Sequence, residues 1–334
     1  MSALLEVDGL TVTLPVAGLQ QPVLRDISFT LGQGEALGLV GESGSGKSMT
    51  ARAIGRLLPP GAQCEGRISF DGDSVLELDG AGLRTYRTHG VAMIFQDPRA
   101  SINPVRRVGD FLTEALVTNE GVKQDDANTR AAELLDAVGI DDPRRRMRQY
   151  PHQLSGGMLQ RVMIAAALLI NPRLILADEP TTALDVTTQA EVMAILDTLR
   201  RERGVSMLFI THDLELAAAV CDRTAVMYAG LLMEEQRSLK LDSDPLHPYT
   251  AALVQARPDI SVTHERLLAI PGRPLSAFEA PPGCAFGPRC PHAEPACAQA
   301  VPPLLDVDTG RSRCRRLPEL RGTMGAKSAG AGNG

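Results

Sequence analysis

The segment GESGSGKS (Gly41–Ser48) limits what this chain can fold into more than any other stretch. It matches the pattern G-x-x-x-x-G-K-[ST], follows the apolar run ALGLV (Ala36–Val40), and precedes residues with helical spacing to about Leu58. A glycine-rich loop between a strand and a helix turns backbone N–H groups toward a phosphate, and the helix N-terminus favours negative charge. A flexible loop with a chance lysine would not need this strand–loop–helix order. We therefore predict a nucleotide-binding loop, the P-loop, in an α/β fold.

We assign every residue of this loop to nucleotide contact. Gly44 and Gly46 allow the backbone N–H groups of residues 44–48 to converge on the β-phosphate. Lys47 is expected to reach the β- and γ-phosphates, and Ser48 to give an oxygen ligand to Mg²⁺. The predicted contacts to ATP are therefore Gly41, Glu42, Ser43, Gly44, Ser45, Gly46, Lys47 and Ser48.

Further polar residues follow three other apolar runs. Asp178 and Glu179 come after LILA (Leu174–Ala177), where an Mg²⁺ carboxylate and a general base would stand in a P-loop protein. Alone, two adjacent acids would be better explained by an exposed loop or a helix N-cap, but the P-loop favours the catalytic interpretation. Gln96 could ligand Mg²⁺ or orient water, and His212 could contact the γ-phosphate, although a lone Gln or His is usually structural.

A second glycine-rich segment, LSGGM (Leu154–Met158), also opens a predicted helix. The Ser155 hydroxyl, Gly156, Gly157 and the helix N-terminus together form another anion site. The segment has no lysine, no following Ser or Thr and no Mg²⁺ carboxylate, so it can hold a γ-phosphate but cannot bind a nucleotide alone. We therefore predict a composite site, in which LSGGM of one chain closes over the P-loop of another.

The apolar periodicity predicts the architecture around these segments. Strand-like alternation and helical spacing alternate along most of residues 4–235, which predicts a mostly parallel sheet with helices on both faces. Antiparallel strands precede this core, and a helical insertion interrupts it at about 97–170. The expected strands are Glu6–Leu14, Val23–Leu31, Ala36–Val40, Arg67–Gly72, Val91–Gln96, Leu174–Ala177, Met207–Ile210 and Ala225–Tyr228, and the expected helices are Arg107–Leu116, Asp126–Val138, Gly156–Ile170, Thr187–Arg203 and one from Asp213.

Bulk properties exclude several classes of protein. The formal net charge of −6 gives no reason to expect a general nucleic-acid binder. No apolar run approaches the roughly 20 residues that span a bilayer, and MSALLEVDGL lacks the basic and apolar regions of a signal peptide. We expect a cytosolic chain that reaches a membrane through a partner.

The C-terminal part differs in composition from the rest. Residues 242–320 are rich in proline and contain Cys284, Cys290, Cys297 and Cys314, which predicts a small irregular domain stapled by a metal centre. Four thiolates suit an iron–sulfur cluster or zinc equally. Residues 321–334 are predicted to be a disordered tail.

The motifs together resemble the ATPase subunit of an ATP-binding-cassette transporter. The resemblance rests on GESGSGKS, FQDP, LSGGMLQR, LILADEP, TALD (Thr182–Asp185) and THD, in this order over about residues 4–235. It implies a P-loop NTPase (RecA-like) core, with the cassette at 1–241, and makes Gln96 the Q-loop residue, His212 the switch histidine and Asp185 the D-loop residue. It also implies that the helical insertion docks the coupling helices of a membrane permease.

The C-terminal part resembles the oligopeptide/dipeptide/nickel importer ATPases, on the segments FQDPRASINP, PLHPYTAAL and PGCAFGPRCPHAEPAC with Cys314. That family implies a second cassette ATPase subunit, two permease subunits, an extracytoplasmic substrate-binding protein and a peripheral place on the cytoplasmic face of the membrane. It also implies a [4Fe–4S] cluster on the four cysteines, in preference to zinc. A cassette ATPase of another class, such as translation or DNA repair, would show tandem cassettes, long coiled coils or basic patches, and the sequence has none of these. Two alternatives stay open: import of nickel or another non-peptide solute, and an added redox-regulatory role.

Overall fold

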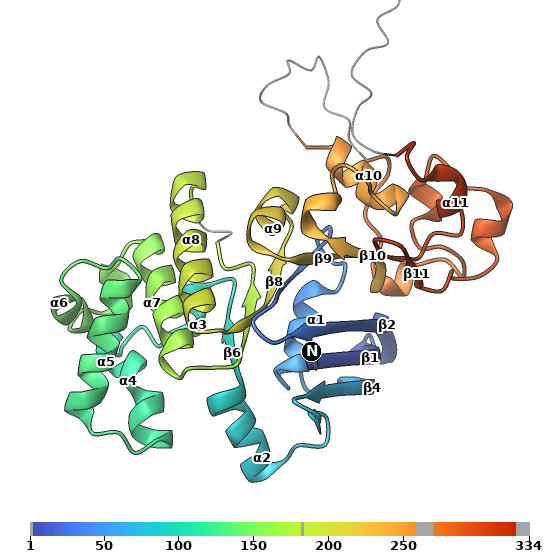
Figure 1. The fold of residues 1–334 in the computed structure, drawn as a ribbon. Coiled ribbons are helices and arrows are strands. Elements are labelled where there is room, and N and C mark those ends of the chain that lie inside the picture. Colours follow the sequence, from blue (N-terminus) through green and yellow to red (C-terminus); the bar gives the residue numbers. More distant parts are fainter. Residues whose placement is uncertain (1–2, 182–183, 258–269, 325–334) are drawn as a thin grey trace, which may run out of the picture.

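The computed structural model describes residues 3–181, 184–257 and 270–324 (Figure 1). Its centre is an eight-stranded sheet with the strand order β11-β12-β10-β9-β3-β8-β7-β6. The bounds of the strands in the order of the chain are β3 Ala36–Val40, β6 Val91–Ile94, β7 Leu174–Asp178, β8 Ser206–Thr211, β9 Arg223–Tyr228, β10 Leu231–Arg237, β11 Leu305–Val307 and β12 Gly310–Ser312.

Five neighbouring strands of this sheet, from β9 to β6, run parallel. All residues of β3 and β7 are buried, which explains why both strands are continuous apolar runs in the sequence. Their carboxyl ends meet at one edge of the sheet, where the residues after β3, β6, β7 and β8 lie near one another. This edge is where ligands bind in open parallel sheets.

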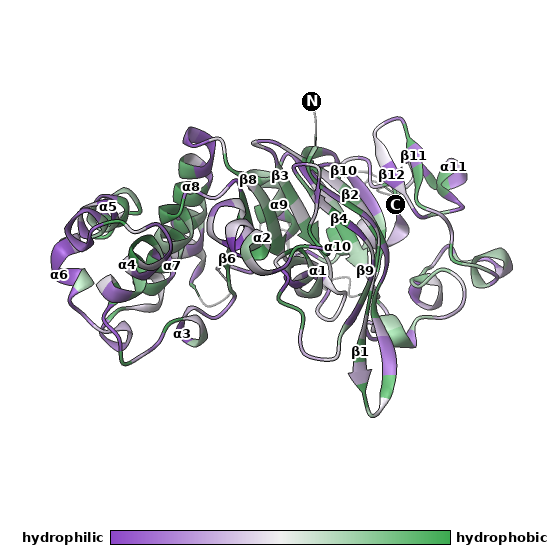
Figure 2. Ribbon diagram, turned by 90° about the horizontal axis from the view of Figure 1, so that it is seen from below, coloured by the Kyte–Doolittle hydropathy of each residue, from purple (hydrophilic) through white to green (hydrophobic). Residues whose placement is uncertain are grey.

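Helices cover both faces of the parallel strands. Along β8, Met207 and Phe209 belong to one hydrophobic cluster, whereas Leu208 and Ile210 belong to the other, as expected for alternating side chains of a strand. The first cluster includes residues of α7 (Gly156–Leu169) and α8 (Val186–Glu202), and the second includes α1 (Lys47–Ile54). Figure 2 shows the hydrophobic residues gathered in β3 and β8 and on α9 (Leu214–Val220).

An antiparallel sheet precedes and flanks the core, with the strand order β2-β1-β4-β5. Its strands are β1 Ala3–Val16, β2 Leu19–Gly32, β4 Gln63–Phe70 and β5 Asp73–Ser74. A short helix, α2 (Gly80–Thr85), connects it to β6. This confirms the predicted leading antiparallel strands, although the strands are longer than the alternating patterns.

The predicted helical insertion is confirmed. It contains α3 Pro98–Ser101, α4 Val108–Asn119, α5 Gln124–Ala137, α6 Pro143–Met147 and α7. Gly139 has a left-handed φ of 75° just after α5, a conformation that commonly ends a helix. Figure 1 shows this helical group and the C-terminal region at opposite ends of the central sheet, which agrees with β6 and β11 being its two edges.

The C-terminal part returns to the cassette and extends its sheet. β10 pairs antiparallel with β9, and β12 pairs with β10, with Ser312 opposite Glu234. Two helices that the sequence analysis did not predict, α10 (Pro248–Gln255) and α11 (Leu317–Leu320), lie in this part. Of the predicted tail, Met324 is buried, and residues 325–334 lie outside the described part.

Among the described residues, the structure contains no helix with the length and apolar character needed to cross a membrane.

Candidate active site

The P-loop joins β3 to α1 at the carboxyl edge of the parallel strands. Gly44 and Gly46 have left-handed φ values of 80° and 106°. At Gly46 space adds a second restriction, since a Cβ atom would come within 2.6 Å of Leu24 Cδ2. The loop therefore takes its shape from glycine conformations that other residues adopt only under strain, while Ser43 and Gly44 at its tip remain exposed.

Lys47 is the first residue of α1, and its side chain is held inside the loop. Its Nζ atom donates hydrogen bonds to the carbonyl oxygens of Gly41 (2.8 Å) and Glu42 (3.1 Å). Burial lowers the pKa of Lys47, and the nearby carboxylates of Glu179 and Asp178 oppose that shift. The cost of burying the Lys47 ammonium thus exceeds its stabilisation by the nearby carboxylates, so a bound anion would stabilise it further.

Ser48 and Asp178 lie together, as predicted. The Ser48 hydroxyl donates to Asp178 Oδ1 at 2.7 Å, although 130 residues separate them in the sequence. Asp178 is the last residue of β7 and is 4% exposed. Burial raises the pKa of its carboxyl, and the hydrogen bond from Ser48 opposes this. The pair offers two hard oxygen donors at one point, which is the donor chemistry that Mg²⁺ prefers.

Glu179 follows β7 in a left-handed conformation with φ of 45°, an uncommon value for a residue with a side chain. Its backbone N–H donates to the Ile210 carbonyl at 3.0 Å, which ties the turn to β8. Such conformations persist where surrounding contacts enforce them, and they are frequent at functional sites.

Three strand ends meet at the Glu179 carboxylate. Gln96 Nε2 donates to Oε2 at 3.0 Å, and His212 Nδ1 lies 3.5 Å from the same oxygen. The structure thus brings together the three residues predicted to be catalytic. One detail of the prediction is wrong: Gln96 does not end a strand, because β6 stops at Ile94 and Gln96 lies in a bend two residues later.

The LSGGM segment lies at the start of α7, apart from α1 in both Figure 1 and Figure 2. Ser155 is the N-cap of α7, and its hydroxyl accepts from the Met158 N–H at 3.3 Å. At Gly157 a Cβ atom would come within 2.9 Å of Thr188 Cγ2, so a glycine is needed where α7 approaches α8. At Gly157 the neighbouring side chain therefore comes from α8.

Asp185 lies beside this second segment as the N-cap of α8. Its carboxylate accepts from the Thr188 N–H at 3.0 Å and from the Thr188 hydroxyl at 2.7 Å. The first two residues of the predicted TALD motif, Thr182 and Ala183, lie outside the described residues.

The four C-terminal cysteines line one small pocket, together with His247 and Arg313. The Cys284 N–H donates to the Cys297 carbonyl at 2.8 Å, and a Cβ on Gly283 would come within 2.3 Å of that oxygen. Burial raises the pKa of Cys284 and of Cys290, and it raises the pKa of Cys314 to about 11. In the part of the chain that the structure describes, no three His, Cys, Asp or Glu side chains are arranged to hold a metal ion.

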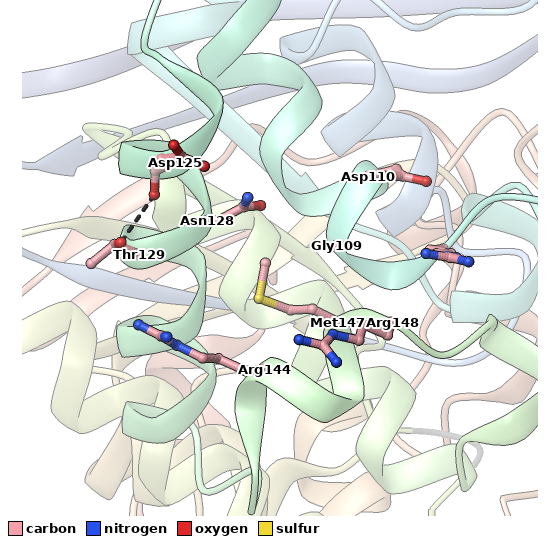
Figure 3. Close-up of a pocket in the computed structure, with 9 residues that line it drawn as sticks. Gly109, Asp110, Asp125, Asn128, Thr129, Arg144, Met147 and Arg148 are labelled. Carbon is pink, nitrogen blue, oxygen red and sulfur yellow. Dashed lines mark hydrogen bonds between the residues drawn. The ribbon is translucent and has the colours of Figure 1, made fainter.

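A further pocket of about 450 Å³ lies on the helical insertion, away from all predicted site residues (Figure 3). Its lining residues come from the first turns of α4 and α5 and from α6, and both charge signs are present. They include Asp110, Asp125, Arg144 and Arg148. Three arginines and two aspartates in one open depression do not specify a ligand.

Two residues that reach the P-loop were missed by the sequence analysis. Arg289 binds the Glu42 side chain, and the Tyr249 hydroxyl accepts from the Glu42 N–H. In each of these contacts, more than 200 residues of sequence separate the two partners. Both lie in segments that carry the family resemblance, PLHPYTAAL and PGCAFGPRCPHAEPAC, but no local spacing assigns them to the P-loop, because each contact depends on the C-terminal part folding back onto the sheet.

Comparison with known proteins places this geometry in a family. Residues 24–182 match the family described as ABC transporter, and residues 233–297 match that described as oligopeptide/dipeptide transporter, C-terminal region. The oligopeptide transport ATP-binding protein OppD of Salmonella typhimurium is 46% identical over 93% of this chain and 93% of its own length. OppD of Bacillus subtilis is 43% identical over 92% of this chain and 87% of its own length.

Solved structures agree with this assignment. The ATP-binding cassette MJ0796, a dimer in a post-hydrolysis state bound to ADP and Pi, has a TM-score of 0.63 and 29% identity, and the match covers 70% of this chain and 98% of MJ0796. The protein cbiO1 of Clostridium perfringens, part of the ABC transporter complex cbiONQ, has a TM-score of 0.62 and 25% identity, over 72% of this chain and 91% of cbiO1. The chain therefore belongs to the ATP-binding proteins of ABC transporters, and within them to the oligopeptide/dipeptide group.

Proposed function

We propose that this protein hydrolyses ATP to drive the import of peptides through a membrane permease. The observation that carries the proposal is the convergence of Gln96 and His212 on Glu179, beside the Ser48–Asp178 pair, in a chain 46% identical to an oligopeptide transport ATP-binding protein. A binding module without catalysis would not need a carboxylate held by two polar groups at this point.

The residues have distinct tasks in hydrolysis. The loop N–H groups and Lys47 bind the phosphates, and the ammonium exchanges its carbonyl partners for phosphate oxygens. Glu179 takes the proton of the attacking water, because its carboxylate lies near enough to act on Lys47 of the loop and is oriented by Gln96. His212 is placed to contact the γ-phosphate. Ser48, Asp178 and Gln96 would hold Mg²⁺, which when bound neutralises charge on the phosphates.

We also propose that the site is completed by a second cassette subunit. Ser155, Gly156 and Gly157 present a helix N-terminus and a hydroxyl but no cation or carboxylate. Two chains placed head to tail would bring this segment of each to the P-loop of the other. The dimeric form of the related cassette MJ0796 supports this arrangement.

A groove of about 350 Å³ between the core and the helical insertion is our candidate for permease docking. It is lined largely by apolar residues such as Phe95, Phe111 and Met163, and Phe95 directly precedes Gln96. A permease helix seated there would sense movement of the residue that contacts Glu179. This would hold the protein at the cytoplasmic face of the membrane as a peripheral subunit, supplied with solute by an extracytoplasmic binding protein.

The function is tested by reconstituting the chain with its permease and partner ATPase in vesicles. ATP hydrolysis should rise when a peptide-loaded binding protein is added, and labelled peptide should accumulate. Uptake of a nickel chelate without peptide would favour the non-peptide importer instead. Leu57→Asp, which changes a groove residue that is 39% exposed, should reduce permease co-purification, whereas Leu239→Asp, at a leucine 81% exposed, should not.

We also propose that one [4Fe–4S] cluster is bound by Cys284, Cys290, Cys297 and Cys314. Their shared pocket supports this, and a cluster can take one thiolate on each of its four iron atoms. His247 lines the same pocket, and its buried Nε2 has no hydrogen-bond partner among the described residues. Such a donor fits a site that receives an electron-rich group.

Anaerobic purification tests the cluster. The protein should contain iron and sulfide and absorb in the visible range, and Cys290→Ser should remove most of this iron and make the region beyond residue 242 more sensitive to protease. Cys64→Ser, which changes a half-buried thiol outside the pocket, should leave the iron content unchanged. Stoichiometric zinc without iron would overturn the assignment.

A further inference from the structure

Arg289 connects the cysteine-containing segment to the P-loop. It lies next to Cys290, and its side chain is 5% exposed. Nη1 donates to Glu42 Oε2 at 2.7 Å and Nη2 donates to Glu42 Oε1 at 3.2 Å, which is a bidentate pairing of guanidinium and carboxylate. This pair joins points 247 residues apart in the sequence.

The orientation of the Arg289 guanidinium is fixed by further contacts. Nε donates to the Pro271 carbonyl at 2.8 Å, and Nη1 also donates to the Tyr228 hydroxyl at 3.3 Å. The group stacks over the rings of Tyr228 and Phe286, at 5.7 Å and 5.9 Å from their centroids. All three guanidinium nitrogens therefore have partners, and lysine could not reproduce this planar set of donors.

The backbone of Glu42 is held by the same region. The hydroxyl of Tyr249, in α10, accepts from the Glu42 N–H at 3.0 Å. The Tyr249 ring packs against Tyr228 and Phe286, with centroids 4.8 Å and 5.2 Å apart. The C-terminal part thus holds this P-loop residue by its main chain and by its side chain.

Glu42 is placed where its position and charge affect phosphate binding. Its carbonyl accepts from Lys47 Nζ at 3.1 Å and from the Ser45 N–H at 3.2 Å. Its carboxylate is also close enough to act on the pKa of Lys47. Without a counter-ion, the Glu42 carboxylate would repel a triphosphate. Arg289 therefore reduces this repulsion and also holds the loop in position.

We propose that Arg289 is a positioning residue of the ATP site, through which the C-terminal region sets the affinity of the P-loop for a nucleoside triphosphate. The inference rests on the proposed ATP site and extends it to a segment outside the cassette. Since Arg289 adjoins Cys290, a change in the cysteine pocket would reach the P-loop through this side chain.

The test compares ATP dissociation constants of full-length variants with their melting temperatures. Arg289→Met should weaken ATP binding about tenfold or more, because the Glu42 carboxylate is left without its counter-ion in the phosphate-binding loop, and Arg289→Lys should fall between this variant and the parent. Adding Glu42→Gln to Arg289→Met should recover at least about threefold of the lost affinity, since the unpaired charge is removed. A residue that only stabilises the fold would not show this recovery.

Arg311 provides a matched control. It is also a C-terminal arginine paired with a carboxylate, that of Glu235 in β10, and it lies in β12, outside both the P-loop and the cysteine pocket. Arg311→Met should lower the melting temperature but leave ATP affinity within about twofold of the parent.

Three outcomes would overturn the inference or its basis. If Arg289→Met binds ATP as the parent does, Arg289 is only a structural contact. If Arg289→Met does not fold, Arg289→Lys and the double variant decide, and parental affinity in both would reject the proposal. If the parent binds no better than Lys47→Ala, the ATP site itself is wrong and the inference falls with it.

Discussion

Two glycine-rich helix starts, the P-loop (Gly41–Ser48) and LSGGM (Leu154–Met158), differ in what the rest of the chain brings to them. At the P-loop, Ser48 meets Asp178 at the end of β7, and Glu179 beside it is contacted from the ends of β6 and β8. At LSGGM, the Cβ position of Gly157 lies close to Thr188 in the first turn of α8, and the Asp185 carboxylate accepts hydrogen bonds from Thr188 of its own helix.

The difference teaches that a helix N-terminus alone is an incomplete phosphate site. The P-loop lies at the edge where parallel strands end, so polar residues from several strands collect there. LSGGM lies on the helical insertion, where no strand ends. In our proposal the first has its cation, metal ligands and base within one chain, and the second works against the P-loop of another chain.

The largest effect is expected from a substitution of Glu179, which should separate ATP hydrolysis from ATP binding at the P-loop site. Glu179→Gln removes the proton acceptor but keeps a side chain that Gln96 can contact. ATP turnover should fall about 10²–10⁴-fold, while equilibrium ATP binding stays near the parent value. Steady-state hydrolysis and a binding isotherm measure the two quantities. Turnover within a few-fold of the parent would reject Glu179 as the base.

The comparison itself predicts opposite phenotypes for one substitution in each segment. Lys47→Ala should weaken ATP binding about 10–100-fold, the value of a lost charge-assisted contact. Ser155→Arg should leave the chain's own ATP affinity unchanged and abolish hydrolysis at the site that it completes on the partner. In a mixture of Lys47→Ala chains with Ser155→Arg chains, a mixed dimer carries both substitutions in one composite site and neither in the other. One composite site is therefore intact in the mixture, which distinguishes the two roles. Loss of ATP binding in Ser155→Arg would contradict the assignment of separate tasks.

Dilution of the unsubstituted protein tests the same difference between the P-loop and LSGGM. If each P-loop is completed by LSGGM of another chain, as we propose, the hydrolysis rate per chain should fall about tenfold or more once dilution separates the subunits. Rates are measured across protein concentrations with the oligomeric state followed by light scattering. A rate per chain that stays constant in clear monomer would show that one chain is sufficient.

The smallest effect is expected in the stability of the nucleotide-free protein. Burial raises the pKa of Asp178 above its unfolded value, so its contribution to stability is present at low pH and is lost as the pH rises through the folded pKa. Asp178→Asn should therefore raise the melting temperature at neutral pH by roughly 1–3 °C, and the gain should shrink toward acidic pH. The same variant should lose Mg²⁺-dependent ATP binding. A lower melting temperature at neutral pH would contradict the burial argument.

Much of the core could be predicted because its signals are local. ALGLV and LILA are continuous apolar runs since β3 and β7 are buried on both faces, and their bounds in the structure agree within a residue. Gln96, Asp178, Glu179 and His212 were found because each follows such a run. The end of β6 was misplaced because Phe95 continues the apolar run VAMI, although the strand has already ended at Ile94.

The structure of the C-terminal part, in contrast, could not be predicted from local signals. The sequence showed four cysteines and many prolines, but α10, the β11–β12 hairpin and its pairing with β10 carry weak periodic signals. Strand pairing across such a distance depends on which edge of the sheet is open, and no local pattern encodes that.

By itself, the sequence determined the kinds of chemistry this protein holds: a phosphate loop, an acid pair at a strand end, a half-site for a second chain and a cluster of thiols. Only the tertiary structure decided which of them act together. The Arg289–Glu42 pair is the clearest case, because its two residues lie 247 positions apart and become partners only when the C-terminal segment packs against β9 and α10. Local spacing fixes backbone conformation within a few residues, whereas the partner of a buried charge is fixed by whichever distant group the completed fold leaves beside it.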